Sequence, residues 1–263
     1  FLENKPVLKG LPALHDDKGK SQSVEICLKD KIYDFRVYLL YTVFEEYDII
    51  SRSVRIENHT GKDILLESVL STCIDNYDDD YDLITFSGKP IYERSFNRTQ
   101  LGELKLTCGS IRGSSSHQNN PFVIFCSKNC DEKVGECYGS ALVYSGNFTA
   151  SMEKTQIGTT RFVMGINPEN FTFKLKDGEV FQAPEVIHSF SNSGFGTLSR
   201  NYHNIIKKHL FRGKYADSKR PILINNWEAT YFKFNAEKLL AIAKQAKTIG
   251  VDTFVLDDGW FLG

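Results

Sequence analysis

The sequence predicts a mostly β protein: a large antiparallel β-sandwich, followed by a linker helix and a strand–helix–strand unit of an α/β domain. Three observations support this. Residues 1–195 consist of short segments that alternate apolar and polar residues, separated by turn residues. Near Gly194 the apolar spacing changes from two to three or four. Beyond Pro221, a strand pattern, a helix pattern and a second strand pattern follow one another.

The first 195 residues contain many strand-like segments without a helical pattern between them. They are rich in β-branched and aromatic residues, and turn sequences such as ENHTGKD (57–63) and KDGE (176–179) separate them. Many short strands at this spacing favour an antiparallel sandwich. The predicted strands are 23–30, 31–44, 47–58, 64–74, 121–127, 138–148, 158–166 and 171–190.

A connecting segment, 196–219, begins with a helical pattern over 196–214. Leu198, Tyr202, Ile205 or Ile206, and Leu210 share one face at helical spacing. The last part carries Lys207, Lys208 and His209, and positive charge is favourable near the carboxyl end of a helix.

Residues 220–263 have the pattern of a βαβ unit. PILINNW (221–227) is an almost continuous apolar run, typical of a strand that is covered on both faces. Asn235 is placed to cap a helix that ends at Gly250, and its predicted apolar face is Leu239, Ile242, Ala243, Ala246 and Ile249. TFVLDD (253–258) is the second strand. Polar residues at strand ends are where barrels and doubly wound sheets place their sites.

Two adjacent carboxylates, Asp257 and Asp258, end this second strand. Neighbouring strand residues point to opposite faces, so the pair cannot flank one scissile bond from opposing sides. Carboxylates accept several hydroxyl hydrogen bonds, and the indoles of Trp227 and Trp260 can stack on a pyranose. Sugar binding is therefore one interpretation. The other is that each aspartate caps the following turn through its own backbone.

Composition excludes several classes of function. Lys plus Arg is 32 against 33 for Asp plus Glu, so no basic field is available for nucleic acid, and no apolar run is long enough to span a membrane. No nucleotide-binding glycine motif occurs, and we predict neither a metal site nor a cofactor. The six cysteines are expected to be reduced structural thiols, the acidic run 74–84 a solvated turn, and His117 a hydrogen-bonding support.

Two C-terminal motifs resemble a known family. RPILINNWEATYF (220–232) and FVLDDGWF (254–261) are similar to segments of bacterial α-galactosidases of glycoside hydrolase family 36. The similarity extends towards the N-terminus through 41–58, 112–122 and 164–186. The resemblance implies a β-sandwich over 1–195, without its first strands, the linker 196–219, and the start of a truncated (β/α)8 catalytic barrel over 220–263.

The resemblance also implies roles for three residues. The aspartates that match Asp257 and Asp258 bind hydroxyls of a terminal galactose around O4 and O6, and the tryptophan that matches Trp227 lines the same pocket. The nucleophile and the acid/base are aspartates on later barrel strands. No Lys-Trp-Asp-like motif occurs here, so we expect no catalytic residue in this chain and no activity from it alone.

The resulting hypothesis is a segment of a retaining α-galactosidase that acts on melibiose- and raffinose-type sugars. The resemblance implies a bacterial cytoplasmic protein and a homo-oligomer such as a homotetramer, without nucleic-acid or membrane partners. Two alternatives stay open. One is a non-catalytic sandwich used for carbohydrate binding or oligomerisation, and the other is an α-N-acetylgalactosaminidase of the same fold.

Overall fold

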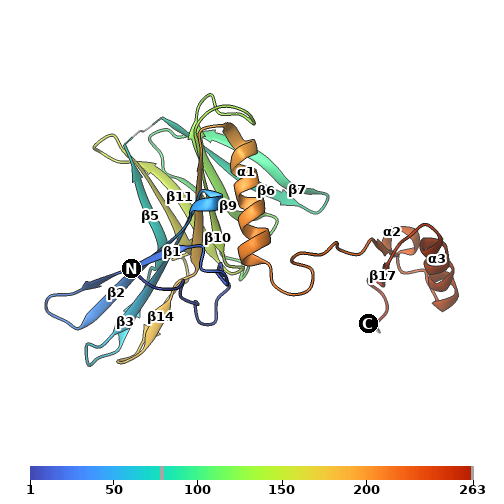
Figure 1. Ribbon diagram of the computed structural model, residues 1–263, viewed down its shortest axis with the longest axis horizontal. Coiled ribbons are helices and arrows are strands. Elements are labelled where there is room, and N and C mark those ends of the chain that lie inside the picture. The colour runs from blue at the N-terminus through green and yellow to red at the C-terminus, as the bar shows by residue number, and fades with distance from the viewer. Residues whose placement is uncertain (78–79, 262–263) are drawn as a thin grey trace. The chain divides into compact units, whose positions relative to one another are not determined.

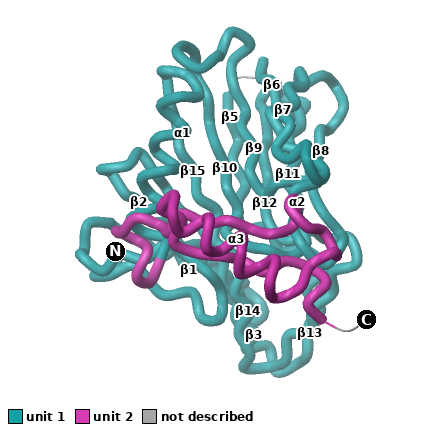
Figure 2. Tube along the Cα trace, turned by 90° about the vertical axis from the view of Figure 1, so that its right-hand side faces the viewer, with its two compact units in different colours: residues 1–211 teal, residues 212–263 magenta. Residues whose placement is uncertain are grey.

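The computed structural model describes residues 1–77 and 80–261, and the chain divides into two compact units. Unit 1 is Phe1–Phe211 and unit 2 is Arg212–Gly263 (Figure 2). Unit 1 is built almost entirely of antiparallel strands, with one long helix, α1 (Gly194–Ile205), lying against them (Figure 1). The sequence-based prediction of a mostly β fold with an antiparallel sandwich is confirmed.

Unit 1 contains a large and a small antiparallel sheet. The large sheet runs in the order β1-β2-β3-β15-β10-β9-β6-β7, with β14 added beside β3, and the small sheet runs β5-β12-β11-β8. The strands of the large sheet are β1 (Gln22–Lys29), β2 (Phe35–Phe44), β3 (Ile49–Asn58), β6 (Tyr81–Lys89), β7 (Tyr92–Gln100), β9 (Asn119–Ser127), β10 (Cys137–Val143), β14 (Val180–Gln182) and β15 (Glu185–Ser191). Those of the small sheet are β5 (Leu70–Asn76), β8 (Leu106–Ser110), β11 (Phe148–Lys154) and β12 (Thr160–Ile166).

The central strands of the large sheet are buried on both faces. On β9, Val123 and Phe125 face the small sheet, whereas Ile124 and Cys126 face the side covered by α1. Because successive strand residues alternate between faces, a strand segment covered on both sides must be apolar at every position, as residues 121–126 of β9 are. One core therefore lies between the two sheets, and the other lies between the large sheet and α1.

Helix α1 confirms the apolar face predicted around Leu198. It buries Leu198, Tyr202 and Ile205, and the Tyr202 hydroxyl donates a hydrogen bond of 2.9 Å to the carbonyl of Ile187 on β15. Gly139 on β10 makes this approach possible, since a Cβ there would lie 2.7 Å from the Tyr202 ring.

The end of the helix differs from the prediction. A π-helical segment, Ile206–Leu210, follows α1 and stops four residues before the expected end at 214. His209 is buried rather than solvated: its Nδ1 donates to the carbonyl of His15 at 2.7 Å, and its ring packs edge-on against Phe44. His209 lies in the last turn of the helical segment, as predicted, and its ring packs against Phe44 on β2.

The predicted strands occur with shifted boundaries. Segment 64–74 splits into β4 (Ile64–Leu66) and β5, and segment 171–190 splits into β13 (Phe173–Leu175), β14 and β15. A short 3-10 turn, Glu45–Tyr47, separates β2 from β3. The pattern missed β6, β7, β8 and β11. The acidic run 74–84 was expected to be a solvated turn, but residues 74–76 end β5, and residues 81–84 begin β6 and are buried. Asp78 and Asp79 lie outside the described residues.

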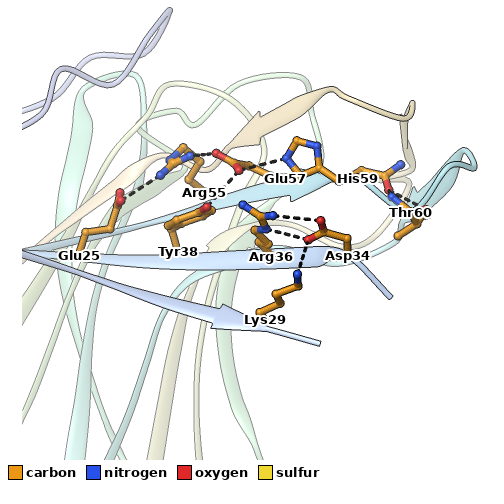
Figure 3. Close-up of polar contacts among 10 residues, drawn as sticks. Glu25, Lys29, Asp34, Arg36, Tyr38, Arg55, Glu57, His59 and Thr60 are labelled. Atoms are coloured by element: carbon orange, nitrogen blue, oxygen red, sulfur yellow. Dashed lines mark hydrogen bonds and ion pairs between the residues drawn. The ribbon is translucent and has the colours of Figure 1, made fainter. Parts of the chain in front are cut away.

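The outer face of β1, β2 and β3 carries a ladder of charged and polar side chains (Figure 3). The Arg55 guanidinium lies 3.8 Å from the centre of the Tyr38 ring and donates to Glu25 at 3.0 Å and to Glu57. Tyr38 also donates to Glu57, at 3.1 Å. Cross-strand pairs of this kind favour one register, although partly exposed ion pairs contribute only about 0–1 kcal/mol each.

A buried carboxylate ties the N-terminal segment to the large sheet. Glu185, at the start of β15, pairs with Lys5 Nζ at 2.7 Å, and both side chains are 1% exposed. The other Glu185 oxygen accepts the backbone N–H of Leu14 at 2.7 Å. The segment around Leu8 and Leu14 is thereby held against the sheet, with both leucines buried.

We predict that Lys5→Met lowers the free energy of unfolding by about 3–5 kcal/mol, because it leaves the Glu185 carboxylate buried without its cation. Urea denaturation measures this difference. The double variant Lys5→Met/Glu185→Leu should recover much of the loss, since an apolar pair replaces the ion pair. Lys9→Met, at an exposed position of the same segment, is the control. Equal stability of Lys5→Met and Lys9→Met would contradict this role.

We predict a pH-dependent loss of stability from His188. Its Nδ1 pairs with Ser140 at 2.9 Å and its Nε2 with Thr72 at 3.0 Å, and burial lowers its pKa from 6.5 to about 3. Below pH 6.5 the unfolded chain gains a proton that the folded chain does not bind. Stability should therefore fall from pH 6.5 towards 3, and His188→Gln should show a shallower fall in urea denaturation. Identical pH slopes would refute the assignment.

Candidate functional site

Unit 2 contains two parallel strands joined through a helix. β16 (Leu223–Asn225) pairs with β17 (Thr253–Val255), and α3 (Ala236–Thr248) lies between them in the chain. The Asn235 side chain caps α3 by accepting the N–H of Lys238 at 3.0 Å, as predicted. Gly250 follows the helix with φ +87, the left-handed conformation that glycine adopts easily. Both strands run in the same direction, so their carboxyl ends meet at one edge.

Three details differ from the sequence-based prediction. The first strand ends at Asn225, and a short helix, α2 (Trp227–Thr230), begins at once, so Trp227 lies on a helical turn and not on the strand. The backbone carbonyl of Asn226 starts this turn by accepting the N–H groups of Ala229 and Thr230 at 3.1 Å. Leu223 is 55% exposed and Ile249 78% exposed, so neither is buried as expected. Ile249 lies past the last turn of α3, where the helical spacing no longer applies.

Asp257 lies beyond the end of β17 and is held at its backbone and its side chain. Its N–H donates to the Asn226 Oδ1 at 2.8 Å. Its carboxylate accepts hydrogen bonds from the Asn225 side-chain amide and, at 2.7 Å, from the N–H of Asp258. These two donors, Asn225 first, lower the pKa of Asp257 from 3.8. The carboxylate is therefore ionised at neutral pH and accepts hydrogen bonds only.

Asp258 is more exposed than Asp257 and turns away from the strand. One oxygen accepts the N–H of Gly259 at 2.8 Å, which is the local turn contact that the sequence allowed. Gly259 has φ +89, and a Cβ there would lie 2.7 Å from the Phe232 ring. Turn capping and ligand binding are compatible at this position, because a carboxylate offers about four acceptor sites and this bond occupies one of them.

Trp227 lies in an aromatic group with Tyr231 and Phe232, whose ring centres are 5.3 and 4.9 Å from its own. Its backbone N–H donates to the Asn225 Oδ1 at 2.6 Å. The structure therefore connects Trp227 to Asp257 through a single side chain, that of Asn225. Trp260 is 66% exposed and packs against Phe261 at 5.4 Å.

Asn225 and Asn226 are two further residues of this edge that were not predicted from the sequence. The Asn225 side-chain amide donates to the carboxylate of Asp257, and the Asn226 side-chain oxygen accepts the backbone N–H of Asp257. Asn226 is fully buried and its amide also donates to Thr230 Oγ1 at 2.9 Å. The sequence contains one indication of them: two consecutive side-chain amides follow an apolar run, and a buried polar side chain needs a hydrogen-bond partner.

The chemistry of this edge is that of a polar binding site. An ionised acceptor, a second exposed carboxylate and an indole are suited to hydroxyl donors and to the apolar face of a sugar ring. Among residues 1–77 and 80–261, no three His, Cys, Asp or Glu side chains form a group that could hold a metal ion. No helix within these ranges has the length and apolar character to cross a membrane.

Comparison with known proteins identifies the family of this chain. Residues 1–176 match the model of the glycosyl hydrolase family 36 N-terminal domain, and residues 180–263 match the melibiase model. The chain belongs to glycoside hydrolase family 36, which confirms the resemblance drawn from its motifs.

Two relatives show the extent of the similarity. The bifunctional α-galactosidase/sucrose kinase AgaSK of Mediterraneibacter gnavus is 46% identical over 97% of this chain and 27% of that protein. The crystal structure of the α-galactosidase AgaA of Geobacillus stearothermophilus superposes with a TM-score of 0.96 at 45% identity, over 99% of this chain and 36% of that chain. This chain thus spans about a third, or less, of the proteins it resembles.

We predict that Gly259→Ala lowers the local stability of the turn after Asp258 by about 1–3 kcal/mol, because it adds a clash with Phe232 to an unfavourable φ. Gly250→Ala is a matched control: its φ is also positive, but nothing lies within 4 Å of its Cβ. Amide hydrogen exchange is measured near each substituted residue. The increase in exchange rate over 253–261 in Gly259→Ala should exceed the increase around residue 250 in Gly250→Ala. Equal effects would show that the contact with Phe232 is unimportant.

Proposed function

We propose that the polypeptide that carries this chain is a retaining α-galactosidase, and that Asp257, Asp258 and Trp227 bind the terminal galactose. The observation that carries this proposal is that the Asn225 side chain links the Asp257 carboxylate to the backbone of Trp227 at the carboxyl ends of two parallel strands. Such strand ends are where α/β barrels place their active sites. The match of residues 180–263 to the melibiase model supports the same conclusion.

In this proposal the two aspartates hold the sugar and do not cleave it. A retaining glycosidase needs a nucleophile and an acid/base about 5–5.5 Å apart across the scissile bond. Asp257 and Asp258 are consecutive, and the Asp257 carboxylate is already bound to Asn225 and to the N–H of Asp258. The sequence contains no Lys-Trp-Asp-like motif, so in this proposal the two carboxylates that carry out double displacement lie outside these 263 residues.

The proposed substrates are melibiose- and raffinose-type sugars, which end in an α-linked galactose. A variant of the Geobacillus AgaA enzyme has been crystallised with raffinose and another with stachyose, and each structure covers 99% of this chain at 45% identity. A hydrolase for α-N-acetylgalactosaminides shares the fold but must accommodate a larger group at one ring position. The relatives named above, all α-galactosidases, favour galactose itself.

A non-catalytic binding module is the competing function. Such a module has no need of a βαβ unit that ends in carboxylates, and this unit is present here. The proposal also includes a homo-oligomer, such as a homotetramer, and a cytoplasmic location. Both rest on the family resemblance.

We predict that Asp258→Ala in the full-length polypeptide lowers kcat/KM for a chromogenic α-galactoside at least about tenfold, because each hydrogen bond to a charged group is worth about 1.5–3 kcal/mol. Circular dichroism should show an unchanged fold, since Asp258 is exposed. Asp63→Ala, which removes an exposed carboxylate from unit 1, is the control. An unchanged kcat/KM for Asp258→Ala would refute the assigned role.

A further inference from the structure

We propose that Asn225 is a positioning residue of the sugar site: its side-chain amide holds the carboxylate of Asp257 and the backbone of Trp227 in one arrangement before the substrate arrives. The inference rests on the proposed function, because it assigns a role within that site. It adds a residue that is not itself required to touch the sugar. Its basis is the set of hydrogen bonds that Asn225 makes with both binding residues.

The two ends of the Asn225 amide have different partners. Nδ2 donates to Asp257 Oδ2, and Oδ1 accepts the Trp227 N–H at 2.6 Å. The side chain can satisfy both contacts only in one amide orientation, since one end donates and the other accepts. Asn225 therefore joins the residue after β17 to the first turn of α2, and loss of its side chain would remove the hydrogen bonds to both Asp257 and Trp227.

The contacts of Asp257 leave a defined part of its carboxylate for a ligand. A carboxylate offers about four acceptor positions, of which the Asn225 amide occupies one on Oδ2 and the Asp258 N–H one on Oδ1. The Asn226 side chain holds the Asp257 backbone at 2.8 Å. With backbone and side chain both held, the remaining acceptor positions point in fixed directions. A hydroxyl that binds there meets an acceptor that needs no reorganisation, which is a source of affinity.

An asparagine is suited to this task and an aspartate is not. Asn225→Asp keeps the oxygen that accepts the Trp227 N–H but replaces the donor with a second carboxylate beside Asp257. Two adjacent carboxylates cannot both stay ionised at low cost, so they share a proton and the pKa of the pair rises. Protonation of one partner restores a donor. The damage caused by Asn225→Asp should therefore diminish as the pH falls.

The test compares Asn225→Asp, Asn225→Ala and the wild type in the full-length polypeptide. We expect kcat/KM for a chromogenic α-galactoside at pH 7 to fall about tenfold or more in both variants, with most of the change in KM. For Asn225→Asp the loss should shrink below about pH 6, whereas for Asn225→Ala it should not shrink as the pH falls. Asn129→Asp adds the same charge at an exposed turn of unit 1 and should leave kcat/KM unchanged.

A second measurement separates this inference from the proposed function. Titration of the Asp257 carboxyl carbon by NMR should give a pKa below 3.8 in the wild type and a higher pKa in Asn225→Ala. An unchanged Asp257 titration, or an Asn225→Asp pH profile parallel to that of the wild type, overturns the positioning role. A wild-type polypeptide that hydrolyses no α-galactoside overturns the proposed function, while the titration still decides whether Asn225 holds Asp257.

Discussion

The central strands of the large sheet carry apolar side chains on both faces, and the arrangement of unit 1 follows from the need to cover each face. Val123 and Phe125 require the small sheet on one side, and Ile124 and Cys126 require α1 on the other. Without either cover, a row of large side chains would be exposed to water at a cost of about 1.5–3 kcal/mol each. The buried Lys5–Glu185 pair and the Tyr202 hydrogen bond attach the N-terminal segment and α1 to the same sheet.

Much of this arrangement was predictable from residue spacing, because burial of one face imposes a period of two on strands and of three to four on helices. The apolar face of α1 was found in this way, and the caps of α3 at Asn235 and Gly250 were found from the residue types that favour helix ends. Strand β7 was missed, since every residue of β7 is exposed and its sequence carries no burial pattern. The packing of His209 between aromatic rings was not predicted, because spacing does not show which partners a titratable side chain finds.

The candidate site was predicted in its residues but not in its connections. The motif and the position of Asp257, Asp258 and Trp227 at the end of the βαβ unit indicated a polar site. The links between them depend on side-chain hydrogen bonds between segments about thirty residues apart, which spacing does not encode. Asn225 and Asn226 make those links, and they hold Asp257 at its carboxylate and its backbone, whereas Asp258 is exposed.

The most direct test of the central claim, that these aspartates hold a galactose whose glycosidic bond is cleaved by carboxylates elsewhere, is an assay of two proteins. Hydrolysis of a chromogenic α-galactoside is measured with residues 1–263 alone and with the full-length polypeptide. Activity in the longer protein only is the predicted result, because the nucleophile and the acid/base lie outside this chain. Turnover by the 263 residues alone would place the catalytic pair among them and contradict the role assigned to Asp257 and Asp258.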